Sequence, residues 1–381
     1  MTDWLTAEEA MARLGVRPQT LYAYVSRGRV RAECDPADPR RSRYRAGDIA
    51  VLSGRKARSR KVADVAAEAI AWGEPVLASA ITTVADGRLY YRGRDAVLLA
   101  QTETLEAVAR LLRGGQGAPM SRGGRIPRAE TMRERAFLLL AARAGVDAPA
   151  RGQSPAALAD EAANLLDDLA DAVAGEAGFG PIHDRLGQAW SCNRDQCDLI
   201  RRALVLLADH ELNASAFAAR VAASTGASLA ASALAGLSAL SGPLHGGMGA
   251  RVQAFADEAV RLGPRAAVTA RIAGDAPVPG FGHNLYPDGD PRAAALLGVL
   301  PVPPMFQALR REVETATGRR ANIDFALVAL AEALKLPQDA PFALFAVARA
   351  AGWIAHAMEQ QATGALIRPR ARYVGPAPAE A

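Results

Sequence analysis

The sequence predicts a mainly α-helical protein with more than one domain. The chain has 381 residues, of which 50% are apolar, so it can bury a large core and exceeds the usual size of one domain. Alanine and leucine dominate while aromatic residues make up 5%, which favours helices over a β-sandwich. Amphipathic segments separated by short Gly/Pro breaks recur along most of the chain. We therefore expect two or three domains, built mostly from helices.

The N-terminal domain begins with two short predicted helices. Thr6 and Glu9 have the spacing of a capping box, and the helix that they open would end at Gly15. A second helix would begin at Pro18 and end at Gly28, because proline is favoured in a first helical turn and glycine just after the end. Two helices joined by a tight turn predict a helix-turn-helix unit.

The next segment predicts a strand, an Asp/Pro turn, a second strand and a short final helix. Over residues 4 to about 53 this pattern resembles the winged helix-turn-helix of the MerR or excisionase type. The resemblance implies that the second helix enters the DNA major groove and that the wing touches phosphates. The expected DNA-binding residues are Gln19, Thr20, Tyr22, Arg43 and Arg45. The alternative is a small helical cap used for protein contacts.

Charge is unevenly distributed along the chain. The formal net charge is +5, and the basic excess lies in the first 61 residues, whereas the remainder is mildly acidic. A basic head favours contact with a polyanion. We expect a winged helix-turn-helix at 1–55, a basic linker at 56–69 and a helical body at 70–376, followed by a disordered tail at 377–381.

The body alternates helical segments with Gly/Pro breaks. The strand signal in it is a pair of β-rich runs around Asp86-Gly87, a hairpin dipeptide. Helices are expected at about 104–113, 129–144, 155–174, 197–209, 213–226, 250–262 and 341–361. No apolar run is long enough to predict a membrane span and the N-terminus does not resemble a signal peptide, so we expect a cytoplasmic protein without membrane contact. Cys192 and Cys197 have no second ligand pair at metal-like spacing, so no metal site is expected.

Two of the five histidines are framed by Gly and Pro. His245 lies in "SGPLHGGMGARV" and His283 in "PGFGHNLYPDGDPRA", where glycines would let a ligand approach the backbone. A helix that begins just after His245 would favour a neutral imidazole that donates a hydrogen bond. His210 precedes Asn213, a capable N-cap. A single loop histidine is more often structural, but two such loops weaken that alternative.

An acid and several arginines complete the candidate set. Asp324 leads the apolar run "NIDFALVAL", where a raised pKa would make it a competent base, although an acid in this position is more often the N-cap of the next helix. Arg292, Arg349 and Arg368 could clamp a dianion, although each alone is more often a surface salt-bridge partner.

Taken together, these motifs resemble the citrate synthase family. The segments "DHELNASAFAARV", "SGPLHGG", "PGFGHNLYPDGDPRA", "NIDF" and "RPRARYVG" have its order and spacing, and "DGRLYYRGRD" resembles its opening hairpin. The resemblance covers about residues 70 to 376. It implies a large domain (about 70–245 and 336–376) and a small mobile domain (about 246–335). It also implies an acyltransferase of the tricarboxylic acid cycle that acts as a homodimer.

The resemblance assigns the catalytic roles to three residues. Asp324 would remove a methyl proton from acetyl-CoA, His245 would donate a hydrogen bond to the thioester oxygen, and His283 would polarise the oxaloacetate carbonyl. Citryl-CoA would then be hydrolysed to citrate and CoA. The oxaloacetate ligands would be His210, Arg292, Arg349 and, across the dimer interface, Arg368. No permanently bound cofactor is implied, because the acyl-CoA is a co-substrate.

The residues expected at CoA are Val278, Pro279, Gly280, Phe281, Gly282, Arg319 and Arg320. The chain departs from the family pattern at Met248-Gly249, where Ala-Asn is common, at Asn284, often basic, and at Ala326-Leu327, which replaces an aromatic-glycine pair. These changes leave propionyl-CoA, which would give 2-methylcitrate, as an alternative to acetyl-CoA. A second alternative is a DNA-binding regulator whose synthase-like body senses a metabolite.

Overall fold

The fold is that of a computed structural model, which describes residues 4–14, 16, 18–26, 29–35, 38–50, 77–115, 126–371 and 373–376. The chain divides into two compact units, Met1–Ala78 and Ser79–Ala381. Each described unit has a separate buried core. The expected basic linker and disordered tail lie outside the described residues, and so do Gly15 and Gly28.

The N-terminal unit contains two helices and a three-stranded antiparallel sheet. Its elements are β1 (Trp4–Leu5), α1 (Ala7–Leu14), α2 (Pro18–Ser26), β2 (Ala32–Asp35) and β3 (Asp38–Arg45), with strand order β1-β3-β2. Residues 46–50 are again helical. The capping box is confirmed, because the Thr6 N–H donates to Glu9 at 2.9 Å and the Glu9 N–H donates to Thr6 Oγ1 at 3.3 Å. Leu14, Leu21 and Tyr44 bury their side chains between the helices and the sheet.

The body opens with the expected hairpin. Its strands are β4 (Thr82–Ala85), β5 (Arg88–Tyr91) and β6 (Arg94–Asp95), and all neighbours pair antiparallel. Asp86 and Gly87 form the turn with φ values of 48° and 70°, the left-handed conformation that a two-residue hairpin turn needs. Tyr91 points from β5 into the core, and its hydroxyl donates to the carbonyls of Val205 and Leu206 at 3.0 and 3.2 Å.

Helices form the rest of the described body. They are α4 (Ala96–Thr102), α5 (Leu105–Leu112), α6 (Met132–Val146), α7 (Pro155–Ala174), α8 (Ile182–Ala189), α9 (Arg194–Leu207), α10 (Ala214–Ser224), α11 (Leu229–Leu240), α12 (Met248–Leu262), α13 (Pro264–Ala273), α14 (Pro291–Leu297), α15 (Pro304–Thr317), α16 (Ile323–Leu334) and α17 (Ala340–Thr363). All seven expected body helices are present, with ends shifted by a few residues. Helices α4, α8, α11 and α13 to α16 were not among the expected ranges, and some of them are short.

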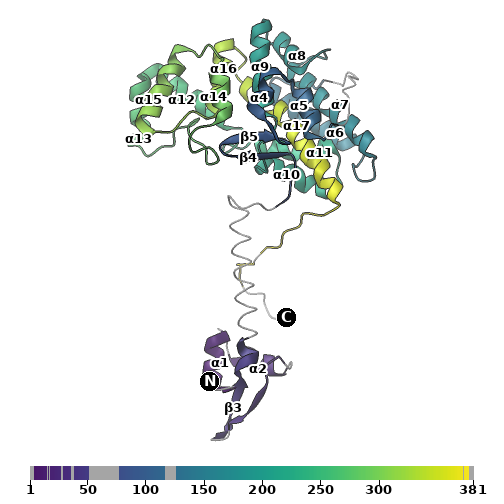
Figure 1. The fold of residues 1–381 in the computed structure, drawn as a ribbon, viewed down its shortest axis with the longest axis vertical. Coiled ribbons are helices and arrows are strands. Elements are labelled where there is room, and N and C mark those ends of the chain that lie inside the picture. The colour runs from purple at the N-terminus through teal and green to yellow at the C-terminus, as the bar shows by residue number, and fades with distance from the viewer. Residues whose placement is uncertain are drawn as a thin grey trace. The chain divides into compact units, whose positions relative to one another are not determined.

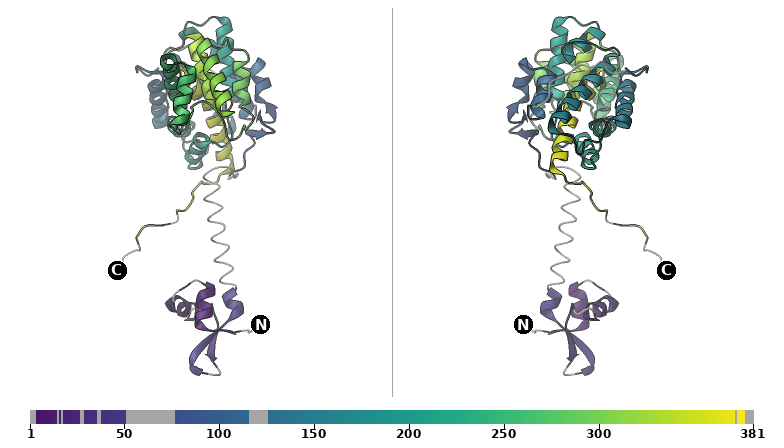
Figure 2. Two further views of the ribbon diagram at one scale, coloured as in Figure 1. Left: turned by 90° about the vertical axis from the view of Figure 1, so that its left-hand side faces the viewer. Right: turned by 90° about the vertical axis from the view of Figure 1, so that its right-hand side faces the viewer.

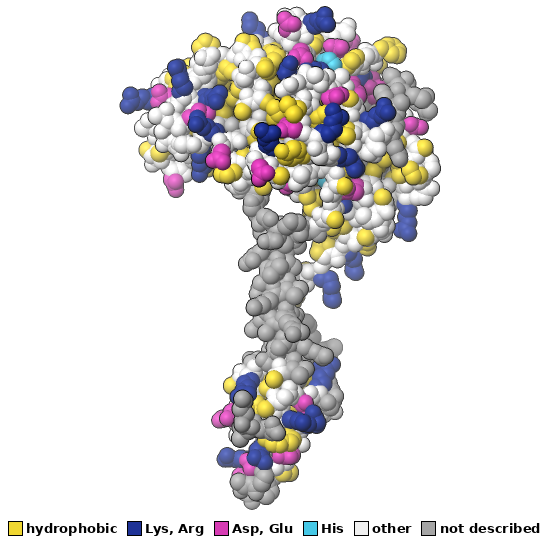
Figure 3. Space-filling view, in the orientation of Figure 1, with side chains coloured by type: hydrophobic (Ala, Val, Ile, Leu, Met, Phe, Trp, Pro, Cys, Tyr) yellow, Lys and Arg dark blue, Asp and Glu magenta, His cyan; other side chains and the backbone are white. Residues whose placement is uncertain are grey.

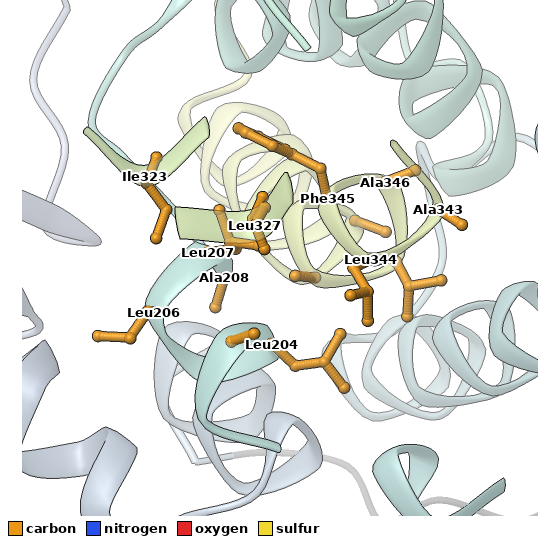
Figure 4. Packing of buried hydrophobic residues seen from close by; sticks show 14 of the residues in the cluster. Leu204, Leu206, Leu207, Ala208, Ile323, Leu327, Ala343, Leu344, Phe345 and Ala346 are labelled. Carbon is orange, nitrogen blue, oxygen red and sulfur yellow. The ribbon is translucent and has the colours of Figure 1, made fainter. Parts of the chain in front are cut away.

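Helix α17 lies in the core of the body. Figure 4 shows side chains of α9, α16 and α17, among them Leu204, Leu327 and Leu344, gathered at one place in this core. Neighbouring helices lie on several sides of α17, drawn in yellow in Figures 1 and 2. Within the part of the chain that the structure describes, α17 alone is long and apolar enough to cross a membrane, but 83% of its most apolar window is buried in the body. Such burial is usual for the core helix of a folded protein.

Helices α12, α13 and α15 lie together at one side of the body (Figure 1). Helices α14 and α16 connect this group to α9, which α14 and α16 both contact. Helices α12 to α16 all lie within residues 246–335, the segment expected to form a small mobile domain. The mobility of that segment remains a prediction.

Candidate active site

The loop after α9 carries the first candidate histidine. His210 is buried, and its Nε2 lies 2.9 Å from the hydroxyl of Tyr286. The backbone of this loop is held by Tyr91, whose hydroxyl also lies 3.3 Å from the Asp209 carbonyl. Asp209 is buried as well, and its Oδ2 lies 3.2 Å from Nε2 of His356 on α17. Contacts from β5 and α17 therefore fix the position of His210.

His283 lies beside His210 in space. Their ring centroids are 5.1 Å apart in an edge-to-face arrangement, and Tyr286 packs against both rings. The Leu285 N–H donates to Nδ1 of His283 at 3.1 Å, so a neutral His283 carries its proton on Nε2. No described residue accepts a hydrogen bond from that Nε2–H. The His283 side chain can therefore donate to a ligand.

His245 occupies a tight turn directly before α12. The His245 N–H donates to the Gly242 carbonyl at 3.0 Å, and the Met248 N–H donates to the His245 carbonyl at 2.9 Å. A Cβ on Gly246 would lie 2.7 Å from Leu240, so the turn's own packing requires this glycine. Packing against Leu240 thus accounts for this glycine, and the expectation that the glycines let a ligand approach the backbone stays a prediction.

A serine, itself hydrogen-bonded to a tryptophan, contacts Nε2 of the His245 ring. Nε2 of His245 lies 2.9 Å from Ser215 Oγ, which accepts a hydrogen bond from Trp353 Nε1 at 3.0 Å. Ser215 Oγ donates to Oδ1 of Asn213, the N-cap of α10, at 2.7 Å. The indole of Trp353 only donates and the amide oxygen of Asn213 only accepts, so in this arrangement His245 donates from Nε2 to Ser215. If the Ser215 hydroxyl turns to His245 Nε2 instead, the ring carries its proton on Nδ1 and can donate to a ligand.

All three rings are held in the neutral state by their surroundings. Burial, reinforced by the charge of Arg349, lowers the pKa of His245 to about 4. Burial and the charge of Arg292 lower the pKa of His283 to about 4, and burial also lowers the pKa of His210. Burial is the largest of these causes. The contribution expected from the helix that begins after His245 stays a prediction.

Asp324 lies in the first turn of α16. The N-cap is Asn322, whose Oδ1 accepts from the N–H groups of Asp324 at 3.1 Å and Phe325 at 3.4 Å. The alternative that Asp324 serves as the cap is therefore wrong. Its carboxylate makes no hydrogen bond or ion pair with any described residue, and burial raises its pKa to about 6. Such a carboxyl group is poised to exchange a proton near neutral pH.

Two of the three candidate arginines are buried near these groups. Arg292 donates through Nε and Nη2 to the two oxygens of Asp290, at 2.9 and 2.8 Å. Arg349 donates through Nε to the Leu207 carbonyl at 2.9 Å, and its guanidinium lies 4.9 Å from the Phe345 ring. Neither is a surface salt-bridge partner, because 2% and 1% of these residues are exposed. Asp290 occupies two of the five N–H donors of Arg292, which leaves both N–H groups of Nη1 and one of Nη2 for a ligand.

Arg368 is not brought to this site within one chain. It lies on an exposed segment after α17 and makes no ion pair with the described residues. Its expected contribution across a dimer interface stays a prediction.

The loop of residues 278–282 is paired with the segment that leads into α16. The Gly282 N–H donates to the Arg320 carbonyl at 2.8 Å, and the Asn322 N–H donates to the Gly280 carbonyl at 2.9 Å. Gly280 has a φ of 84°, and a Cβ there would lie 2.9 Å from Val252 and 3.0 Å from Phe325. Phe281 is buried against Phe325.

The two arginines expected beside this loop are exposed. Arg320 forms an ion pair with Glu314 at 2.9 Å, while Arg319 makes none with the described residues. Both remain candidates for contact with an anionic group.

Sequence reasoning missed three residues of this site. Tyr286 and Asp290 stand inside the quoted "GFGHNLYPDGDPRA" motif, and Ser215 stands two residues after Asn213. Nothing in their local sequence shows their roles, because the partner of Tyr286 is 76 positions away and that of Ser215 is 30 positions away. No group of three or more His, Cys, Asp or Glu side chains suited to a metal ion occurs among the residues that were described.

The N-terminal unit places its candidate DNA-binding residues on two surfaces. Gln19, Thr20 and Tyr22 are exposed on α2, opposite the buried Leu21. Arg43 on β3 forms ion pairs with Glu33 and Asp35, at 3.3 and 4.0 Å.

Arg45 is exposed at the end of β3, and neighbouring arginines are also paired with acids. Arg31 pairs with Asp48 and Arg41 with Asp38. Figure 3 accordingly shows both signs of charge on the visible face of this unit.

Residues 162–370 match the family model described as "Citrate synthase, C-terminal domain". The chain is 40% identical over 190 residues, 46% of its length and 50% of the relative's, to "Putative citrate synthase 2" of Mycobacterium tuberculosis. It is 36% identical over 187 residues, 46% of its length and 48% of the relative's, to "2-methylcitrate synthase 2" of Corynebacterium glutamicum. The chain thus spans about half the length of the curated relatives it matches.

A solved structure has the same fold. It is the ternary complex of citrate synthase from Thermoplasma acidophilum with carboxymethyl coenzyme A and oxaloacetate. The TM-score is 0.65 at 23% identity, over 80% of this chain and 95% of that one.

Proposed function

The chain belongs to the citrate synthase family, and on this premise we propose that it condenses acetyl-CoA with oxaloacetate and hydrolyses the citryl-CoA formed. The products would be citrate and free CoA. The observation that carries the proposal is the meeting of neutral histidines with a carboxyl group of raised pKa and two buried arginines. This set supplies a base, hydrogen-bond donors and anion ligands, which the condensation needs together.

Each step has a suitable group in this site. Asp324 takes a proton from the methyl carbon while His245, once the Ser215 hydroxyl has turned to its Nε2 and its own proton lies on Nδ1, stabilises the developing enolate oxygen. The enolate carbon then attacks the ketone carbon of oxaloacetate, and His283, the donor on Nε2, gives its proton to the new alkoxide. Water finally cleaves the C–S bond and releases the thiol of CoA. A positioned base and an oxyanion donor each contribute about a hundred-fold or more.

Oxaloacetate would bind through its two carboxylates. Arg349 and the N–H groups of Arg292 that Asp290 does not use would pair with these carboxylates, and His210 would donate to the same ligand. The loop 278–282 would lie along the adenine of CoA, and Arg319 and Arg320 would meet its phosphates. Arg368 would reach the site of the partner subunit, so the active form would be a homodimer. The expected location is the cytoplasm.

A thiol-release assay tests the reaction directly. Purified protein with oxaloacetate and acetyl-CoA should liberate CoA at a rate proportional to enzyme concentration, and Asp324→Asn should lose at least about a hundred-fold in turnover. A buried-serine variant outside the site, Ser232→Ala, serves as the control for handling and folding. The absence of CoA release with acetyl-, propionyl- and butyryl-CoA alike would overturn the proposal.

Acetyl-CoA is our proposed acyl donor, and propionyl-CoA is the rival. Met248 and Gly249 follow the His245 turn, and Ala326-Leu327 follow Asp324, so the walls beside the acyl group differ from the common family pattern. A relative is named a 2-methylcitrate synthase. The ratio of kcat/KM for the two acyl-CoA substrates decides between them. A ratio above one for propionyl-CoA would reverse our choice.

We also propose that the N-terminal unit is a winged helix-turn-helix that binds DNA. The exposed side chains on α2 and the β2–β3 wing support the proposal. In a two-fold dimer the half-sites should lie about one helical turn, 34–36 Å, apart or a multiple of it. Footprinting on genomic fragments, with and without oxaloacetate and CoA, tests this. A protein that turns over substrate but gives no sequence-selective footprint would leave the unit as a protein-contact module.

A further inference from the structure

A pocket outside the catalytic site lies between α5, α7 and α8. Its volume is about 150 Å³, and its wall includes Glu106, Arg110, Arg113, Leu166 and Asp167. A cavity of about that volume can hold a molecule of roughly the size of benzene. None of these residues belongs to the catalytic set, so the pocket has no role in the proposed condensation.

Arg113 places a positive charge in this pocket that has no counter-ion among the described residues. Nε and Nη1 of Arg113 are buried and have no hydrogen-bond partner among the described residues. Burial and the nearby charge of Arg110 lower the pKa of Arg113 to about 10, so the group is still a cation at neutral pH. Arg113 as a whole is half-buried. Burying part of an unpaired cation costs free energy, and an anion in contact with it removes part of that cost.

The acidic residues of the wall do not supply that counter-ion. Asp167 forms an ion pair with Arg185. Glu106 accepts through Oε1 from the N–H of Ile182, the first residue of α8, at 2.5 Å. Its second oxygen, Oε2, is buried without a partner, so it can accept a hydrogen bond from a ligand.

We propose that this pocket binds a small organic anion whose acidic group pairs with Arg113 and whose hydroxyl or amino group donates to Glu106. A carboxylate and a phosphate monoester share this chemistry. The ligand has roughly the size of benzene, and its remaining atoms would contact apolar side chains of the wall such as Leu166 and Ile182. Glycerol 3-phosphate and glycerate are suitable probes of the two acidic groups, and glycerol lacks the charge.

Calorimetric titration of the full chain at low ionic strength tests the proposal. At least one of the two anions should bind, glycerol should not, and Arg113→Gln should weaken binding ten-fold or more. Arg265→Gln, which removes an exposed arginine on α13, should leave the affinity unchanged. Arg349→Gln should also leave it unchanged, which separates this pocket from the catalytic site.

Thermal melting gives an independent readout of the same cation. Without ligand, Arg113→Gln should melt no lower than the unmodified protein, because it removes an unpaired buried charge, and this outcome also shows that the variant folds. Equal anion affinity in Arg113→Gln, or no binding of either anion at 20 mM (on the order of a hundred times a typical metabolite affinity), would show that the pocket holds only water. The CoA-release assay is independent of both results.

Discussion

At the scale of single residues, burial sets the chemistry of the site. The same desolvation lowers the pKa of His245 and His283 to about 4 and raises that of Asp324 to about 6. In each case burial disfavours the charged form. The histidines become neutral donors, and the carboxyl group becomes a base of useful strength near neutral pH.

The raised pKa of Asp324 predicts the pH dependence of the reaction. The base must be ionised, so kcat/KM should rise about ten-fold per pH unit up to about pH 6 and level off above it. The two histidines with pKa near 4 stay neutral from pH 5 to 8 and should add no step there. A pH–rate profile with oxaloacetate and acetyl-CoA measures this, and a limb centred below pH 5 would contradict it.

The same shift predicts a stability change. The folded pKa of Asp324 lies above its ordinary value of 3.8, so the folded state loses stability as the pH rises from about 4 to about 6. At pH 7 Asp324→Asn should therefore be more stable than the unmodified protein, by on the order of 1–3 kcal/mol. Urea denaturation at pH 7 and pH 4.5 checks this, since the gain should shrink at the lower pH. An equal effect at both values would point to a cause other than ionisation.

Ser215 predicts a selective loss of turnover. Ser215→Ala removes the partner of His245 Nε2, so the ring can place its proton on the wrong nitrogen. We expect kcat to fall by about ten-fold to a hundred-fold, with little change in the KM for oxaloacetate. The matched control is Ser232→Ala, which removes the hydroxyl of a second buried serine. That hydroxyl donates to the backbone carbonyl of Ser228. Equal kcat in both variants would exclude this role for Ser215.

At the scale of elements, the site is built from helix ends and the turns between them. Asp290 caps α14, holds Arg292 and accepts from the N–H of Ile323 at 3.0 Å, so it ties the starts of α14 and α16 together. Asn322 caps α16 and donates through Nδ2 to the Gly282 carbonyl at 3.1 Å. Asp290 thus links the starts of α14 and α16, and Asn322 links the start of α16 to Gly282.

A substitution at Gly280 tests how the loop 278–282 is held in place. Gly280→Ala places a methyl group 2.9 Å from Val252 in a backbone conformation with φ of 84°, so the loop 278–282 must shift. We expect the KM for acetyl-CoA to rise about ten-fold while oxaloacetate affinity changes little, an order of magnitude that corresponds to about 1.4 kcal/mol. Gly318→Ala, with φ of 70° but no close neighbour, separates backbone strain from the collision. Equal effects of the two variants would contradict a role of the contact.

At the scale of the whole molecule, two units with separate cores share one chain. The core of the N-terminal unit lies between a sheet and two helices, and the core of the described body lies around α9, α16 and α17. Each set of candidate functional residues lies within a single unit. Catalysis by the body and nucleic-acid binding by the head are therefore separable proposals.

The dimer proposal predicts complementation between two inactive chains. Arg368→Ala and Asp324→Ala should each abolish most CoA release, because one loses a ligand of the partner's site and the other loses the base. A heterodimer of the two contains one site with Asp324 and the partner's Arg368 intact. Tandem-tag purified heterodimers should thus recover about half of the unmodified activity per dimer, by symmetry of the two sites. No recovery would mean that the site is not shared between subunits.

Local sequence determined the parts of this protein that depend on neighbouring residues. The Thr6–Glu9 capping box, the Asp86-Gly87 turn and the long amphipathic helices follow from caps, turn residues and periodicity. The candidates His245, His283 and Asp324 were identified from their own segments. Segments with little periodicity, such as α11 with its Ala- and Leu-rich sequence, gave no such signal.

Only the tertiary structure decided what these residues contact. The Ser215–His245 and His210–Tyr286 pairs join loops far apart in the chain. Asp290 takes up some of the N–H donors of Arg292 because both residues lie at the start of α14. The pKa shifts arise mainly from burial, which depends on all the elements that surround a group rather than on its sequence neighbours. Residue type fixes which proton a side chain can exchange, and packing fixes the pH at which it does so.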